Sequence, residues 1–100
     1  MAESGVIEVR QTSNGEPSGF EVIVREAGGE SRHHVTASKR FLERATDRCT
    51  PERCVEAAFR FLLDREPRES ILGRFDLSVI ARYFPEFERE LPRYLAGAAD

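Results

Sequence analysis

The sequence predicts an α+β domain in which a three-stranded antiparallel meander precedes four to five helices packed on one face of the sheet. Apolar and polar residues alternate up to about residue 37, and helical spacing replaces this alternation afterwards. The strands precede the helices without strand–helix–strand alternation, which favours the α+β class. We expect strands at about 5–12, 19–26 and 31–37, and helices at about 38–46, 51–65, 68–72, 77–84 and 86–95.

Two turns define the predicted meander. The first two strands are joined by residues 13–18, which contain the turn formers Asn14, Gly15 and Pro17. Gly28-Gly29 predicts a second tight hairpin, because glycine accepts the positive φ angles of such turns. The expected cross-strand pairs are Ile7 with Val24, Val9 with Val22, Gln11 with Phe20, Val22 with Val35, and Val24 with His33.

The predicted sheet has one apolar and one polar face. The apolar face consists of Ile7, Val9, Phe20, Val22, Val24 and Val35. The polar face consists of Glu8, Arg10, Glu21, Arg25, Arg32, His34 and Thr36, with Arg10 across from Glu21. Val6 and Ile23 interrupt this polarity, either as ordinary exposed aliphatics or as part of a surface that meets a partner.

The longest helical pattern is residues 50–63. Thr50 is its expected N-cap, Pro51 suits the first helical position, and Pro67 ends the helix. Glu56, Arg60 and Asp64 follow one another at i, i+4 spacing on its polar strip.

The flanking helices carry similar signals. Ser38 is the expected cap of the helix before residue 50, and Asp76 that of residues 77–84. Gly73 is expected to end a short helix at 68–72. Pro92 is expected to kink or break the last helix.

Composition indicates one globular domain over residues 1–100. Charged residues make up 33% and hydrophobic residues 40% of the chain. We expect residues 1–4 and 96–100 to fray. No apolar run has the length of a membrane span, and the first residues lack the pattern of a secretory signal, which favours a cytoplasmic protein.

The stretch from Phe59 to Glu90, FRFLLDREPRESILGRFDLSVIARYFPEFERE, resembles a group of short bacterial proteins described only as hypothetical or uncharacterised. With the preceding GFEVIVREAGGESRHHV segment, the resemblance covers most of the chain. It implies a bacterial origin, and it transfers no activity and no functional residue.

The residues that carry chemistry do not form a recognised motif. Cys49 and Cys54 are five residues apart, unlike the ligand pairs of zinc sites or a redox CxxC pair. His33 and His34 are adjacent on a strand and therefore face opposite ways, so they do not readily bind one metal. We predict no cofactor and no metal site, a buried Cys54, a partly buried His33 bonded to the backbone, and a solvent-facing His34.

The carboxylates Glu66, Glu69 and Asp76 alternate with arginines between residues 65 and 76. This segment is either a solvated turn with weak ion pairs or a docking surface for a charged partner. Asp76 has the additional expected role of a helix cap.

The function predicted from these patterns is that of a protein-interaction module that binds another protein or forms a homodimer. The second half of the chain holds more apolar side chains than a thin sheet readily covers, although a closed monomeric core is an alternative. The candidate interface residues are Ile23, Phe61, Val79, Tyr83, Phe87 and Tyr94.

Two other classes remain open. The first is a nucleic-acid-binding regulator with a basic patch of Arg25, Arg32, Arg74 and Arg82. The net charge of -3, with 15 basic and 18 acidic residues, counts against it. The second is an enzyme without a recognisable motif.

Overall fold

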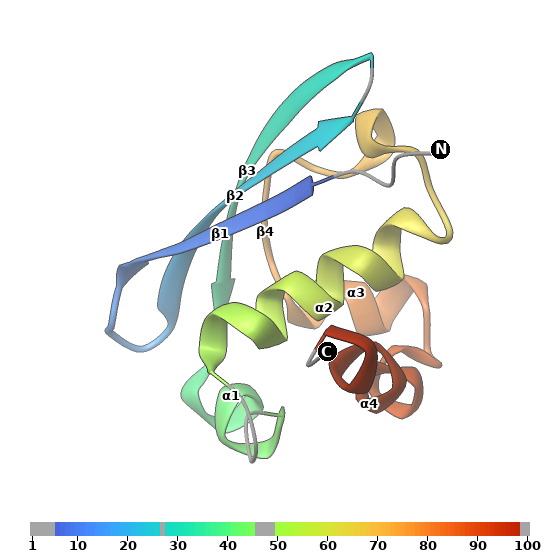
Figure 1. Ribbon diagram of the computed structural model, residues 1–100. Helices are drawn as coiled ribbons and strands as arrows, with labels where there is room; N and C mark the ends of the chain where they lie inside the picture. The colour runs from blue at the N-terminus through green and yellow to red at the C-terminus, as the bar shows by residue number, and fades with distance from the viewer. Residues whose placement is uncertain (1–5, 27, 46–49, 99–100) are drawn as a thin grey trace.

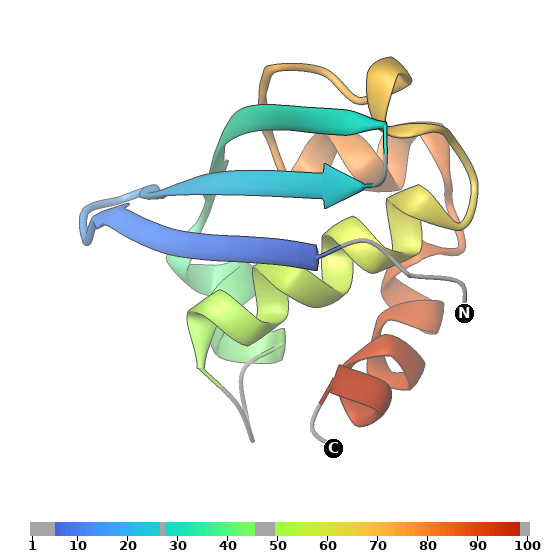
Figure 2. The same ribbon diagram turned by 45° about the horizontal axis from the view of Figure 1, so that its top comes forward.

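The computed structural model describes residues 6–26, 28–45 and 50–98. Over these residues, a sheet with strand order β1-β2-β3-β4 carries its helices on one side (Figures 1 and 2). The strands are β1 (Val6–Ser13), β2 (Ser18–Glu26), β3 (Gly29–Ala37) and β4 (Arg74–Asp76). The helices are α1 (Lys39–Ala45), α2 (Pro51–Leu63), α3 (Ser78–Tyr83) and α4 (Phe87–Ala98), with a 3-10 turn, η1 (Arg68–Ser70). The predicted α+β class is confirmed.

The meander forms as predicted, with one correction to its register. Ile7 pairs with Val24 and Val9 with Val22, as expected. In the second hairpin, however, Val22 lies opposite His33, because the strands close with Glu26 opposite Gly29, two residues tighter than predicted. A shift of two residues leaves every side chain on its expected face, so the apolar face still points to the helices.

The predicted helix at 68–72 is wrong, and a fourth strand was missed. Only η1 is helical there, and Ile71 already has an extended backbone. β4 pairs in parallel with β3, and hydrogen bonds from His34 N to Gly73 O and from Leu77 N to Thr36 O, both 2.8 Å, flank it. The edge of β3 therefore supplies backbone partners that the local helical pattern does not reveal.

Helix α2 is packed between the sheet and α4 (Figure 1). Its predicted cap is confirmed, since Arg53 N donates to Thr50 Oγ1 at 3.2 Å and Pro51 is the first helical residue. On its polar strip, Arg60 binds Glu56 at 2.7 Å. The helix ends at Leu63, two residues before the expected end, and the chain then turns back through a bond from Glu66 N to Leu62 O.

The remaining helices differ from the prediction mainly at their ends. Phe41 N donates to Ser38 Oγ at 3.1 Å, which confirms the expected cap of α1. Of the expected kink or break at Pro92, the break is wrong, because helix α4 continues through the exposed Pro92 to Ala98, and residues 96–98 belong to the helix. Pro92 donates no N–H bond, so the carbonyl of Glu88, four residues earlier, lacks its usual helical partner.

Candidate functional site

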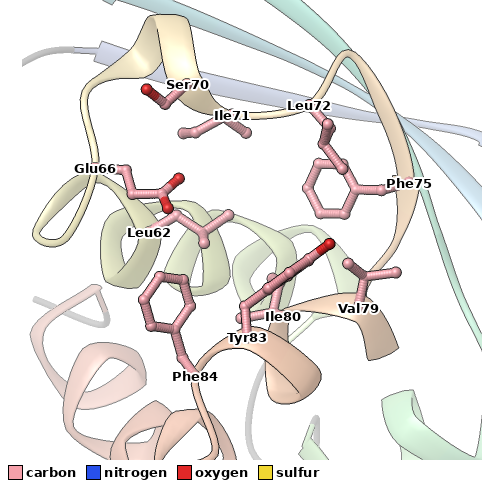
Figure 3. Close-up of a pocket in the computed structure, with 10 residues that line it drawn as sticks. All are labelled: Leu62, Glu66, Ser70, Ile71, Leu72, Phe75, Val79, Ile80, Tyr83 and Phe84. Carbon is pink, nitrogen blue, oxygen red and sulfur yellow. The ribbon is translucent and has the colours of Figure 1, made fainter.

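An apolar pocket of about 180 Å³ lies beside the C-terminal end of α2 (Figure 3). An apolar cavity of about 150 Å³ accepts benzene, so this pocket has room for one large apolar side chain. The residues around it are Leu62, Glu66, Ser70, Ile71, Leu72, Phe75, Val79, Ile80, Tyr83 and Phe84. We call this set the α2–α3 pocket.

Helix α3 forms one wall because it is apolar on two sides. Leu77 and Ile80 are buried against the core. Val79 and Tyr83 are four residues apart, so they lie on one face of the helix, and this face borders the pocket. The Tyr83 side chain remains 71% exposed.

The opposite wall is the extended segment between η1 and β4. Ile71 is buried, whereas Leu72 is 53% exposed at the pocket margin. Adjacent side chains in an extended segment point in opposite directions, so only one of this apolar pair can enter the core.

A buried histidine fixes this wall to the sheet. His33 is 2% exposed, its Nδ1 lies 2.8 Å from Leu72 O, and its Nε2 lies 2.8 Å from Ser31 Oγ. A carbonyl only accepts, so Nδ1 carries a proton and donates to Leu72 O, while Nε2 bonds to the Ser31 hydroxyl. The imidazole also packs against Phe59, with 5.3 Å between ring centroids. The predicted backbone bond of His33 is confirmed, and the ring is fully buried where partial burial was expected.

A second polar anchor holds the start of α3. The Asp76 carboxylate accepts from Thr36 Oγ1 at 2.6 Å and from Ser78 N at 3.0 Å. Burial raises the pKa of Asp76, but these hydrogen bonds outweigh it and hold the pKa below its ordinary value. The helix N-cap is Leu77 and not Asp76 as predicted, but the Asp76 carboxylate still accepts a bond from the first helical N–H and ties α3 to β3.

Glu66 is the one residue of formal charge around the pocket, and its carboxylate points toward the apolar walls (Figure 3). The neighbouring arginines are engaged elsewhere. Arg65 binds Glu86 at 3.1 Å and lies 3.8 Å above the Phe61 ring. Arg68 binds Glu26 at 3.2 Å.

The structure divides the six predicted interface residues into four groups. Phe61 and Phe87 are fully buried in the core and are not accessible to a partner. Tyr94 is half-buried, and its hydroxyl donates to Asp64 at 2.5 Å. Val79 and Tyr83 meet at the α2–α3 pocket, and Ile23 lies apart on the outer face of the sheet.

The six predicted interface residues do not include Glu66, Leu72 or Phe75, although Glu66 belonged to the alternative docking surface for a charged partner. The adjacent apolar residues Ile71 and Leu72 could have indicated the site, because in an extended strand one of the two side chains must point away from the core. Because a helix was predicted at 68–72, this consequence was not drawn from the sequence.

The four arginines of the predicted basic patch do not form one open cationic surface. Arg25 bonds to both Glu8 and Glu30, and Arg32 shares Glu21 with Arg10. Burial raises the pKa of Glu21, but the hydrogen bonds from its two arginines outweigh it and lower the pKa. Arg74 lies on β4 and Arg82 on α3. Carboxylates therefore neutralise much of the outer sheet face.

The residues considered for metal binding do not meet. His33 is buried on one face of β3 and His34 is exposed on the other, Cys54 is buried in the core, and Cys49 lies outside the described residues. No group of three or more potential ligands occurs within residues 6–26, 28–45 and 50–98. None of the helices in these ranges has the length and apolar character needed to cross a membrane.

No family model, curated protein or solved structure matches the chain. The resemblance to short bacterial proteins stays a prediction.

Proposed function

We propose that the protein is a cytoplasmic protein-interaction module that binds a partner protein by accepting one of its apolar side chains in the α2–α3 pocket. The supporting observation is the pocket itself, with Leu72 and Tyr83 exposed at its margin. Large apolar side chains gathered around a hollow are typical of interaction sites.

The dimensions favour a short docked segment over a broad interface. A stable protein–protein interface buries about 800 Å² on each partner, far more than one side chain in this pocket supplies. A pocketed apolar anchor is instead typical of the few residues that dominate binding energy. We therefore expect a partner that inserts one anchor, with Leu72 and Tyr83 covering its sides.

Site-specific photo-crosslinking tests this proposal. p-Benzoylphenylalanine in place of Tyr83 should give a discrete crosslinked product in cells that naturally make the protein. The same group in place of Val6, an exposed apolar residue on β1, is the matched control. The product should disappear when Leu72→Glu is added. No product at position 83, or the same product from both positions, contradicts the proposal.

Homodimerisation is the second form of this function, and light scattering at several concentrations checks it. A dimer that dissociates in Tyr83→Glu would identify the partner as a second copy. The nucleic-acid alternative has no comparable observation in its favour, since Arg25 and Arg32 hold carboxylates. Retention on heparin that falls with salt would revive that alternative.

A further inference from the structure

Glu66 distinguishes the α2–α3 pocket from a purely apolar one. Its backbone N–H is bonded to Leu62 O at 2.8 Å, which fixes the residue where the chain leaves α2. From there, the half-buried side chain reaches toward the pocket (Figure 3). A carboxylate thus faces the space that a partner's side chain would enter.

The described part of the chain supplies no cation for this carboxylate. No ion pair or hydrogen bond reaches the Glu66 side chain from residues 6–26, 28–45 or 50–98. Arg65 is held by Glu86 and by the Phe61 ring, and burial limits its freedom to turn, because only 25% of its side chain is exposed. Arg68 has 12% exposure and is held by Glu26.

A ligand that fills the pocket with an apolar group alone removes water from this carboxylate and provides no new hydrogen bond or charge to replace the lost hydration. Burying a charge without a partner is costly, whereas a cation with good geometry compensates for lost hydration. A ligand that brings both an apolar group and a cation therefore matches the pocket better than an apolar ligand of the same size.

We infer that the partner is a protein segment that places a lysine or arginine next to its apolar anchor, so that the cation pairs with Glu66 while the anchor fills the pocket. This inference depends on the proposed function and specifies the partner's chemistry. The charge pair would set the orientation of the segment, and the apolar anchor would supply most of the affinity.

Peptide selection tests this inference when it is followed by a double-mutant cycle that removes the charge on Glu66 and on the peptide in turn. Random linear peptides displayed on phage are selected on the full chain, and peptides that also bind Tyr83→Glu are discarded. The retained peptides should share an apolar residue and a basic residue at a constant spacing. One is then synthesised with its basic residue as lysine and as norleucine, which keeps the alkyl stem and removes the charge.

The binding of both peptides is measured on the wild type, on Glu66→Gln and on Glu69→Gln. Glu69 is the matched control, because it is an exposed carboxylate three residues away that does not line the pocket. Norleucine should weaken binding about fivefold on the wild type and on Glu69→Gln, as expected for a partly exposed ion pair, and by less than about twofold on Glu66→Gln.

The outcomes separate the two proposals. Equal norleucine effects on the wild type and Glu66→Gln, or pocket-dependent peptides without a basic residue, overturn the inference and leave the docking function standing. Failure to select any peptide that is sensitive to Tyr83→Glu overturns the docking function and the inference with it. A second copy in the pocket, seen as a dimer lost in Tyr83→Glu, also overturns the inference.

Discussion

Phe61 provides a sharp test of the fold because the sequence suggests an interface residue where the structure has a core residue. Its ring is fully buried and makes edge-to-face contacts with Phe84, Phe87 and Tyr94, with centroids 5.8, 5.0 and 5.7 Å away. The Arg65 guanidinium covers one ring face at 3.8 Å. Phe61→Ala removes the common member of all these contacts.

The expected cost is about 4 kcal/mol of unfolding free energy. Truncation of a buried phenylalanine to alanine costs about 3–5 kcal/mol, and the simultaneous loss of three aromatic pairs keeps this site from the lower end of that range. A domain of this size has a stability of about 5–15 kcal/mol, so the variant is severely weakened. Phe61→Leu keeps part of the volume and should lose about 1–2 kcal/mol.

Urea unfolding followed by far-UV circular dichroism measures this loss. With a slope of about 2 kcal/mol per M, the midpoint of Phe61→Ala should fall by about 2 M. Tyr83→Ala is the control, and its midpoint should move by less than about 0.3 M because the side chain is 71% exposed. A wild-type midpoint for Phe61→Ala in the isolated protein would refute the assignment of this ring to the core.

Three further predictions concern the polar anchors and the second hairpin. Asp76→Asn should cost about 1 kcal/mol at neutral pH, because the carboxylate's hydrogen bonds to Thr36 and Ser78 weaken. The folded-state pKa of Asp76 is lowered, so its stabilisation is complete above the ordinary carboxyl pKa and is lost as pH falls through the lowered value. The urea midpoints of wild type and variant should therefore begin to approach each other below about pH 4 and meet only below the lowered pKa. His33→Ala should cost about 2–4 kcal/mol in the same assay, since it removes two hydrogen bonds and the contact with Phe59, and a loss below about 1 kcal/mol would contradict the anchoring role. Gly29→Ala should cost about 1 kcal/mol, because Gly29 has a φ of +154° and an added Cβ would lie 3.0 Å from Arg68 Nη2. Gly28→Ala is the control and should stay within about 0.5 kcal/mol, because an added Cβ there has nothing within 4 Å. Equal thermal midpoints for the two variants would count against this explanation.

The meander and α2 are predictable because their signals are local. Alternation decides which face of β1 and β2 is buried, and the Thr50-Pro51 pair marks the start of α2 in any surroundings. The second hairpin shows the limit of such signals. Two adjacent glycines and an alanine allow more than one turn position, and the pairing of Glu26 with Gly29 depends on the register of the whole strand.

Strand β4 is not predictable from its own residues. Arg74, Phe75 and Asp76 form a segment too short for alternation to identify, and the segment is a strand because the edge of β3 lies beside it. Sequence reasoning likewise did not place Glu66 at the pocket, since a carboxylate in a run of alternating charges is usually solvated. Only the turn that follows α2 brings it to face apolar walls.

The same tertiary contact explains both the wrong helix and the site. A helix over 68–72 would have placed Ile71 and Leu72 side by side on its surface and left the edge of β3 without a neighbouring strand. In the structure, the bond from His33 to Leu72 O and the pairing of β4 with β3 keep this segment extended. Ile71 is therefore buried in the core, and Leu72 lies at the margin of the pocket. The apolar surplus inferred from the sequence is thus reduced by the burial of Phe61 and Phe87 and persists around Leu72, Val79 and Tyr83. The interaction hypothesis therefore concerns one pocket with one charge, which is narrower than the helical surface first expected.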